Sequence, residues 1–305
     1  MLLPDSFHFT QQNLQDYHDC PRRFYLRAIK QLEWPAIESE PIREQERLIE
    51  LGSRFHLLCQ QYFSGIPAVT LSAQVTDAEL SLWWNCFLAA DFISLAGSRA
   101  VEKMLSLHFA GYRLAAKYDL VVKLPEGGIL IYDWKTSQKQ PRRQYLLERM
   151  QSKVYPLVAA LAQTANPIAA DSIEMIYWYP ALDGSEIRLQ YSHTQMLEDK
   201  KQIEWVISDI IGKKEEEDFF KTENSKLCTF CRYRSLCDRG LAAGVAGVED
   251  VDHDPDPGAA DALAAFVAQP GNAGDFFVID QVRDLFDHLL FVHHAGNFGD
   301  DDLFA

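Results

Sequence analysis

Long apolar segments are missing from this 305-residue chain, and that absence excludes one class of protein. A helix that crosses a membrane needs ~20 consecutive apolar residues. The longest tempting stretch here, Val154 to Ala162, is less than half of that length. The first residues also lack the basic segment followed by an apolar one that marks a secretory signal peptide. We therefore expect a cytoplasmic protein without a membrane partner.

Basic residues are outnumbered by acidic ones, since 29 Lys and Arg accompany 44 Asp and Glu, and the formal net charge is therefore -15. The imbalance is concentrated in residues 241–305, where 13 Asp and Glu residues accompany a single base, Arg283. Residues 1–240 are nearly neutral, so a local basic groove for nucleic acid is not excluded. We expect residues 1–240 to form one folded domain and residues 241–305 an acidic, partly disordered tail. Residues 278–286 could form an amphipathic helix there, to dock on the body, bind a partner or occupy the basic groove.

Cysteine is scarce, since a chain of this length has only six, too few for a framework of disulfide bonds. They are Cys20, Cys59, Cys86, Cys228, Cys231 and Cys237. The last three fall within ten residues and begin with a C-x₂-C pattern, which in a reducing compartment indicates a metal site. Zinc and iron–sulfur sites share this spacing, so it does not choose between them. Cys59 and Cys86 lie in apolar surroundings and are interpreted as core thiols.

The apolar pattern of residues 1–240 changes between helical and strand periods. Helical spacing predicts helices over residues 11–30, 44–63, 77–95, 142–163 and 193–220. Two-residue alternation between turn residues predicts strands over residues 105–114, 116–124, 128–134, 174–179 and 186–191. This order predicts an α/β domain with a mixed sheet.

The segment YDLVVKLPEGGILIYDWKTS contains the residues best suited to chemistry. Residues two apart on a strand face the same side, so Asp133 and Lys135 project together while Trp134 faces away. If the turn has an odd number of residues centred on Glu126, Asp119 lies directly opposite Asp133. Their Cβ atoms would then be roughly 5 Å apart on one face of the sheet. An even loop without a bulge would separate them.

Two carboxylates this close repel each other, and a divalent cation relieves the repulsion. Oxygen ligands suit Mg²⁺ or Mn²⁺, which can polarise a phosphoryl oxygen and lower the pKa of a bound water. Lys135 would then orient that water or stabilise the developing negative charge. The alternative is a surface hairpin with an ordinary Asp–Lys pair, because D-x-K is a common sequence. Glu102, which precedes the first predicted strand, is interpreted as a structural acid.

Two further motifs favour the metal site. The segment Leu51 to His56 places a glycine one turn before a histidine, so the helix could approach the sheet while the imidazole reaches a cation. Gln151 and Tyr155 are four residues apart and share one helix face. Together with Asp119 and the D-x-K segment, and in the same order, these motifs resemble those of the RecB-like branch of the PD-(D/E)XK nucleases.

This resemblance covers residues 15–237 and implies a restriction-endonuclease-like fold, with a mixed central sheet flanked by helices. Ala116 departs from the pattern, since many relatives have glycine there. The resemblance implies metal-dependent hydrolysis of DNA phosphodiester bonds by an activated water. The implied metal ligands are His56, Asp119, Asp133 and the backbone carbonyl of Trp134. The implied catalytic residues are Asp119, Asp133, Lys135, Gln151 and Tyr155.

The segment Tyr17 to Tyr25, which contains Cys20, resembles the first cysteine segment of iron–sulfur RecB-like nucleases. These include AddB-type nucleases and CRISPR-adaptation exonucleases. The resemblance implies a [4Fe–4S] cluster held by one early and three late cysteines, Cys20, Cys228, Cys231 and Cys237. Such an iron–sulfur subdomain would join the N- and C-terminal segments of the domain, and closing so long a loop restricts the unfolded chain. Zinc is the alternative occupant.

Basic residues near these motifs suit a bound nucleic-acid strand. They are Arg22, Arg23, Arg27, Lys139, Arg142, Arg143 and Arg149. We expect an exonuclease of DNA repair, recombination or defence that acts on single-stranded DNA or free ends. A helicase or another repair or defence protein is the expected partner, because the chain has no helicase motif. The alternatives are a nucleic-acid-binding protein that has the cluster but no catalysis, and an iron–sulfur scaffold, which leaves the Asp and Lys pattern unexplained.

Overall fold

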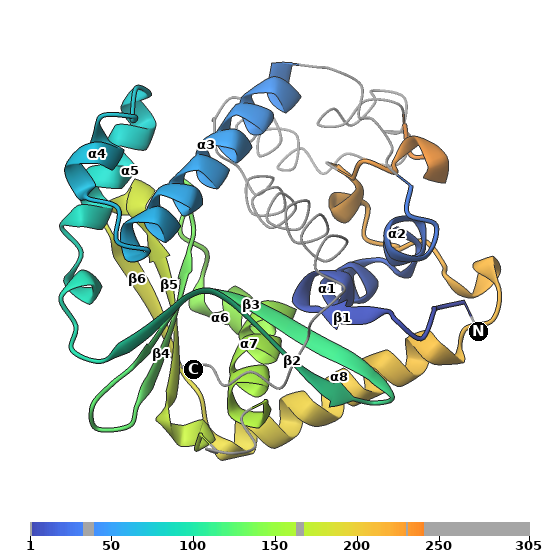
Figure 1. Ribbon diagram of the computed structural model, residues 1–305. Coiled ribbons are helices and arrows are strands. Elements are labelled where there is room, and N and C mark those ends of the chain that lie inside the picture. Colours follow the sequence, from blue (N-terminus) through green and yellow to red (C-terminus); the bar gives the residue numbers. More distant parts are fainter. Residues whose placement is uncertain (1, 33–39, 163–167, 230, 241–305) are drawn as a thin grey trace.

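The computed structural model describes residues 2–32, 40–162, 168–229 and 231–240 (Figure 1). The predicted acidic tail with its amphipathic helix, residues 241–305, lies outside this part of the chain. Within the described part, no helix combines the length and the apolar character needed to cross a membrane.

Six strands in the described residues form one mixed sheet. They are β1 (His8–Thr10), β2 (Ser98–Phe109), β3 (Tyr112–Lys123), β4 (Ile129–Trp134), β5 (Ile173–Tyr179) and β6 (Ser185–Gln190). The strand order is β1-β3-β4-β5-β6, and β2 pairs with β3. β1 is parallel to β3 and β4 is parallel to β5, whereas the remaining neighbours are antiparallel. The predicted mixed sheet is confirmed.

Strand β3 pairs with three strands although it has only two edges, and this leaves a gap in the sheet. β2 pairs with β3 at every position except Asp119, so β1 and β4 must share the other edge of β3. β1 pairs with residues 113–115 and β4 with residues 120–123. Between them, residues 116–119 have no strand partner on that edge among the described residues. We call this break the strand gap, and Asp119 lies in it.

Two hairpin turns set the register of β2, β3 and β4. The first turn lies at Ala110 and Gly111, which both have positive φ angles of 48° and 85°. The first predicted strand, 105–114, was therefore wrong at both ends, because β2 begins at residue 98 and residues 112–114 belong to β3. In the second turn, the N–H of Leu124 donates to the carbonyl of Gly128 at 2.8 Å. The turn is thus centred on Glu126, as predicted.

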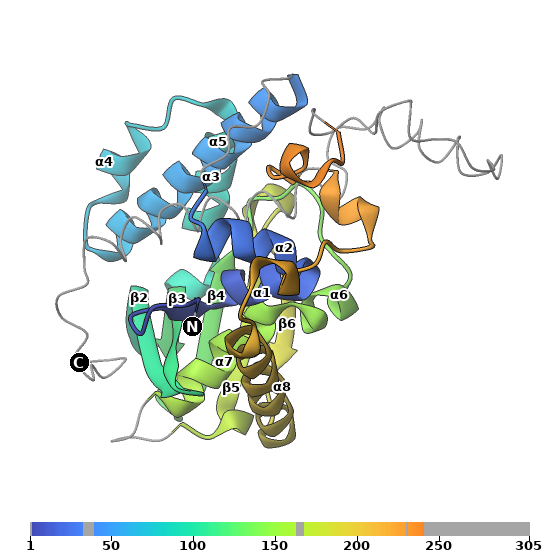
Figure 2. The same cartoon turned by 90° about the vertical axis from the view of Figure 1, so that its right-hand side faces the viewer.

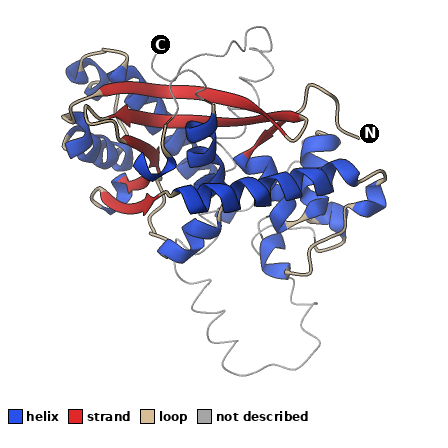
Figure 3. Ribbon diagram, turned by 90° about the horizontal axis from the view of Figure 1, so that it is seen from below, coloured by secondary structure: helices blue, strands red, loops and turns tan. Residues whose placement is uncertain are grey.

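Helices cover both faces of the sheet (Figure 2). On one face lie α3 (Glu40–Phe63), α4 (Ala68–Ser72) and α5 (Ala78–Leu88). On the other lie α1 (Gln11–Asp19), α2 (Pro21–Phe24), α6 (Arg143–Glu148), α7 (Met150–Leu161) and α8 (His193–Gly212). Figure 3 shows α8 on the outside of this second layer, running along the length of the sheet. The predicted arrangement of a mixed sheet flanked by helices is confirmed.

Each face of the sheet has its own apolar core. The α7-side core contains Leu14, Val121, Ile131, Val158 and Met175, and the α3-side core contains Phe55, Trp83, Leu120, Trp134 and Trp178. Regular alternation places residues two apart on the same face. Tyr118 nevertheless packs in the α7-side core and Leu120 in the α3-side core. The alternation therefore changes at Asp119, next to the strand gap.

Two of the predicted helices are broken. Helix 11–30 stops at residue 19, because Cys20 is extended (φ -161°, ψ 103°) before Pro21. A residue before proline is disfavoured in helical conformation, whereas proline itself suits the first position of the next helix. Helix 142–163 is divided into α6 and α7 by the extended Arg149 (ψ 142°). The last predicted helix is shorter than expected and ends at Gly212.

Candidate active site

Asp119 lies in the strand gap with its carboxylate turned toward β4. It is 1 % exposed, and its Oδ2 accepts a hydrogen bond from the backbone N–H of Trp134 at 2.8 Å. One further pair of the β3–β4 ladder would put Asp119 opposite Asp133, so the predicted register is confirmed. In a continuous sheet, the N–H of Trp134 would donate to a backbone carbonyl of the neighbouring strand, and here the carboxylate of Asp119 takes the place of that carbonyl. This hydrogen bond ties Asp119 to the D-x-K segment.

Asp133, Lys135 and Gln151 form a closed hydrogen-bonded unit between β4 and α7. The fully buried Asp133 accepts from Nε2 of Gln151 at 2.7 Å, and its Oδ2 lies 3.0 Å from Nζ of Lys135. The same ammonium donates to Oε1 of Gln151 at 3.0 Å. Trp134 points into the α3-side core, so the predicted alternation of this segment is confirmed. Each group in the unit restrains the other two.

His56 approaches Asp119 from α3. Its Nδ1 is 3.2 Å from Oδ1 of Asp119, and the imidazole is 22 % exposed. Gly52 lies one turn earlier, where a Cβ would be only 3.0 Å from Oγ1 of Thr136. The missing side chain therefore lets α3 lie against the segment that follows β4, as the sequence predicts. That approach brings the imidazole to the buried carboxylate.

Glu102 is the acid whose position the sequence reasoning missed. It lies inside β2, not ahead of the first strand, and the β2–β3 register on both sides of it places it opposite Asp119. Its φ of 50° is uncommon for a residue with a side chain, and its Oε2 is 2.8 Å from Nζ of Lys117. His56, Glu102 and Asp119 each offer a ligand atom within 4.8 Å of the other two. A hairpin turn at residues 110–111 places position 102 opposite position 119, so recognising this turn in the sequence would have predicted the pairing.

The structure differs from the expectation that Asp119 and Asp133 project from one face of the sheet, because helices on opposite faces contact them. Asp119 is approached by His56 from α3, whereas Asp133 is bonded to Gln151 of α7. The physical reason is the change of alternation at Asp119. In the part of the chain that the structure describes, the ligand group within 4.8 Å does not include Asp133. The Trp134 N–H bonds Asp119, and the role expected for the Trp134 carbonyl as a metal ligand stays a prediction.

Tyr155 follows Gln151 by one turn of α7 and is 2 % exposed. Its ring centroid is 5.2 Å from that of Tyr118, and its backbone carbonyl accepts from the Tyr118 hydroxyl at 2.9 Å. These contacts pack α7 against β3 directly beside Asp119.

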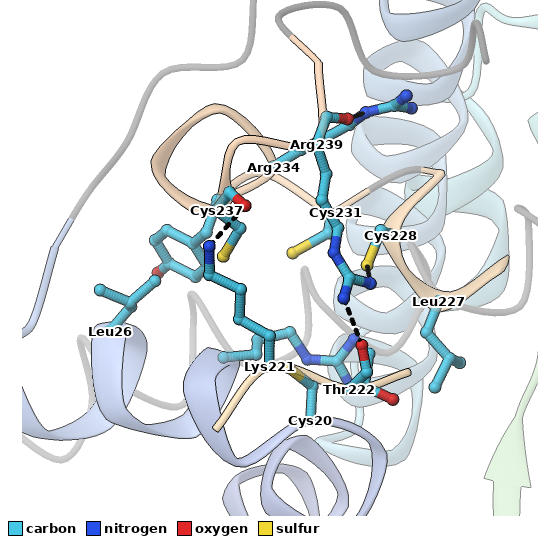
Figure 4. A pocket seen from close by; sticks show the side chains of 12 residues that line it. Cys20, Leu26, Lys221, Thr222, Leu227, Cys228, Cys231, Arg234, Cys237 and Arg239 are labelled. Atoms are coloured by element: carbon cyan, nitrogen blue, oxygen red, sulfur yellow. Dashed lines mark hydrogen bonds between the residues drawn. The ribbon is translucent and has the colours of Figure 1, made fainter. Parts of the chain in front are cut away.

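The four cysteines expected to bind a cluster line one pocket (Figure 4). They are Cys20, Cys228, Cys231 and Cys237, and more than 200 residues separate the first from the others. Four basic side chains line the same pocket, namely Arg23, Lys221, Arg234 and Arg239. Nη1 of Arg239 donates to Sγ of Cys228 at 3.1 Å. Positive charge in this pocket suits the negative charge that thiolates would place there.

Burial affects the ionisation of two of these thiols. Desolvation raises the pKa of Cys231 to about 11, although nearby Arg23 opposes the rise. Desolvation and then the neighbouring Cys20 raise the pKa of Cys237, against the effect of Lys221. A metal that binds here must therefore displace protons, and its affinity should rise with pH.

Cys59 and Cys86 lie outside this pocket, as predicted. Cys59 is 1 % exposed within the α3-side core, and burial, followed by the charges of Asp119 and Glu102, raises its pKa well above the usual value. Cys86 is half-buried against the same core.

Some of the basic residues expected to contact nucleic acid are buried or paired with acids of the same chain. Arg23 is 4 % exposed, with ion-pair distances of 2.7 Å to Asp16 and 2.8 Å to Asp19. Arg27 shares Asp16 at 3.1 Å. The prediction for Arg23 was wrong, because helical spacing does not reveal acids that pair with it inside the fold. The exposed members of the set are Arg142 and Arg143.

The fold and the site together define the class of protein. A mixed sheet flanked by helices, with buried acids at a strand gap and a lysine two residues after one of them, is consistent with a restriction-endonuclease-like nuclease. The family model of the PD-(D/E)XK nuclease superfamily matches residues 8–238, which is most of the chain. The protein belongs to this superfamily.

Among the solved structures that are similar to the chain are the following two. The crystal structure of SSO0001 has 14% sequence identity and a TM-score of 0.37, over 77% of this chain and 87% of that one. A protein from Eubacterium rectale named "Putative exonuclease" has 9% identity and a TM-score of 0.46, over 82% of this chain and 95% of that one. No curated protein matches the sequence.

Proposed function

We propose that this protein is a DNA exonuclease of the RecB-like branch that requires Mg²⁺ or Mn²⁺. One observation carries the proposal: the β3–β4 hairpin ties Asp119, through the Trp134 N–H, to the bonded unit that contains Asp133 and Lys135. An ordinary surface hairpin would leave these acids in water, yet they are 1 % and 0 % exposed. Buried carboxylates are costly unless they are paired or bind a metal.

The donors near Asp119 fit a divalent cation. Carboxylate oxygens with an imidazole and water suit Mn²⁺, and carboxylates with water suit Mg²⁺. We propose that the cation is held by His56, Asp119, Asp133 and the carbonyl of Trp134, and that Glu102 adds a further carboxylate. Bound there, the cation would polarise a phosphoryl oxygen and lower the pKa of a water molecule.

The other polar groups of the site act on the phosphate and the water. Lys135, restrained by Asp133 and Gln151, stabilises the negative charge that develops on the phosphate or orients the attacking water. Gln151 keeps that ammonium in place, and Tyr155 fixes the helix that carries Gln151. Water adds to phosphorus, one P–O bond breaks, and the products are a phosphate monoester and a free hydroxyl. No covalent intermediate is expected.

We further propose that the cysteine pocket holds a [4Fe–4S] cluster, which joins α1 and α2 to residues 228–237 within a single domain of residues 1–240. The support for this proposal is that all four thiols line one pocket together with four basic side chains. Zinc is the alternative occupant, because zinc and iron–sulfur sites share the C-x₂-C spacing.

The substrate we propose is single-stranded DNA or DNA with free ends. Arg142 and Arg143 are exposed at the start of α6, between the D-x-K segment and Gln151, where they can hold backbone phosphates. Such contacts carry no base-specific information. We also propose action in the cytoplasm, in repair, recombination or defence, with a helicase or another protein of those processes as partner.

The test is cleavage of end-labelled single- and double-stranded DNA by protein purified without oxygen, with and without Mg²⁺ or Mn²⁺. Asp133→Ala and Lys135→Ala should abolish cleavage, and Lys200→Ala, which removes a half-exposed lysine of α8, should not. Equal cleavage by all variants would refute the mechanism. DNA binding without cleavage by the wild type would instead indicate a nucleic-acid-binding protein.

A further inference from the structure

Helix α7 begins without a cap from its own chain segment. Arg149, at the N-cap position, makes no side-chain hydrogen bond to the first turn. The first N–H groups of a helix have no partner within it and need one from elsewhere. The N–H of Met150 donates to Oε1 of Gln15 at 2.9 Å. Gln15 belongs to α1 and is 3 % exposed, so a buried side chain of another helix caps α7.

This cap lies next to the bonded unit of the active site. Met150 directly precedes Gln151, whose amide bonds Asp133 at 2.7 Å and Lys135 at 3.0 Å. A hydrogen bond weakens steeply once its length or angle departs from the optimum, so a shift of about 1 Å in the first turn would break at least one of them. Helix ends fray, and an uncapped first turn is the part of α7 that moves most easily. The position of the Gln151 amide therefore depends on the cap.

The amide of Gln15 is itself held in place. Its Nε2 donates to Oδ1 of Asp19 at 2.7 Å, which decides that the oxygen end faces Met150. The other oxygen of Asp19 is 2.8 Å from Nη2 of Arg23, a side chain that lines the cysteine pocket. Nη1 of Arg149 is 3.7 Å from that same oxygen. Helix α1 thus connects the wall of the cysteine pocket to the first turn of α7.

We propose that Gln15 is a positioning residue of the nuclease reaction, which fixes the first turn of α7 so that Gln151 reaches Asp133 and Lys135. This inference rests on the proposed nuclease function. Gln15 acts through Gln151 and does not touch the reacting groups. Through Asp19 and Arg23, the structure around the cysteine pocket contributes to the geometry of the active site.

The test compares Gln15→Met with Gln12→Met. Gln12 lies on the same helix, is 7 % exposed and bonds Asp16 at 3.3 Å, so its replacement removes a buried amide but not the cap of α7. Cleavage of end-labelled single-stranded DNA is measured over a range of substrate concentrations, per folded protein of matched iron content. Gln15→Met should lower kcat on the order of tenfold to a hundredfold at nearly unchanged KM. Gln12→Met should change kcat little.

A pair of exchanged groups tests the orientation of the amide. Gln15→Glu keeps an acceptor for the N–H of Met150 but faces the carboxylate of Asp19. Combining it with Asp19→Asn restores a hydrogen bond between positions 15 and 19, with the new amide at position 19 as the donor and the new carboxylate at position 15 as the acceptor. The double variant should have a higher kcat than Gln15→Glu alone, because coupled neighbours depart from additivity. Additive losses in this cycle would count against the proposed orientation.

Amide hydrogen exchange gives a readout that does not require activity. Exchange over residues 150–154 should be faster in Gln15→Met than in the wild type and unchanged in Gln12→Met. Unchanged kcat and exchange in Gln15→Met would overturn the proposal, as would a loss of kcat that only follows loss of folded, iron-loaded protein. A wild type that cleaves no DNA would refute the nuclease function and the positioning role with it, while the exchange data would still report whether the cap exists.

Discussion

Replacing Gly52 by alanine should lower nuclease activity at least roughly tenfold, while the folded domain persists because the free energy of unfolding falls by no more than about 2 kcal/mol. A Cβ at this position would lie 3.0 Å from Oγ1 of Thr136, a contact that is too short by a few tenths of an ångström. Either α3 or Thr136 must move to relieve it. Because His56 follows one turn later and lies 3.2 Å from Asp119, a movement of α3 withdraws the imidazole from the carboxylate.

Two opposing contributions determine the change in stability. Overpacking of a tight contact costs ~1–3 kcal/mol. Alanine in the interior of a helix is better than glycine by ~1 kcal/mol. The free energy of unfolding should therefore fall by no more than about 2 kcal/mol. A misplaced group at the active site can cost about a hundredfold for a displacement of ~1 Å, so we expect a loss of kcat/KM of at least roughly tenfold.

The assay measures DNA cleavage and Tm on the same preparations. Gly212→Ala is the matched control, since a Cβ there would meet no atom within 4 Å. Thr136→Ala removes Oγ1 and leaves the Thr136 Cβ at 4.0 Å, so it makes room for the new methyl group. Gly52→Ala combined with Thr136→Ala should therefore regain most of the activity of Thr136→Ala alone. A fully active Gly52→Ala, or a double variant without recovery, would refute this reasoning.

Three further predictions follow from the structure. Gln151→Ala should lower kcat on the order of tenfold to a hundredfold in the same assay, because both hydrogen bonds to the Asp–Lys pair are lost; unchanged kcat would count against its role. Cys20→Ser should reduce iron per protein and Tm together, while Cys86→Ser should not; full iron content in Cys20→Ser would contradict cluster ligation. Burial raises the pKa of Asp199 despite its hydrogen bond from Gln195 at 2.8 Å. A carboxyl with a raised folded-state pKa contributes most stability below its unfolded pKa of ~3.9 and loses it as the pH rises. Asp199→Asn should therefore raise Tm at pH 7 and less so toward pH 4, and an equal gain at both would contradict this assignment.

Local patterns were enough to predict which residues of β3 and of the segment at the end of β4 lie beside one another. Strand alternation places Asp133 and Lys135 on one side, and an odd turn centred on Glu126 places Asp119 opposite Asp133. Both arguments need only a short segment of chain and fixed backbone geometry. The glycine one turn before His56 likewise predicted the close approach of α3 to the sheet.

Features set by contacts between distant segments were not predictable from these patterns. The pairing of Glu102 with Asp119 depends on a turn at residues 110–111, whereas the predicted strands were divided at residue 115. The change of alternation at Asp119 arises where β1 and β4 divide one edge of β3. Helical spacing predicts that Arg23 is an exposed base, and only the folded chain brings Asp16 and Asp19 around it. The cap of α7 by Gln15 joins residues 135 positions apart.

The central claim is that the acids around the strand gap, with His56, hold a divalent cation. Anomalous diffraction from crystals soaked in Mn²⁺ tests it most directly. We expect a peak within ~2.5 Å of carboxylate oxygens of both Asp119 and Asp133, with His56 or Glu102 beside it. The absence of a peak there at millimolar Mn²⁺, or a peak held by other residues, would contradict the account.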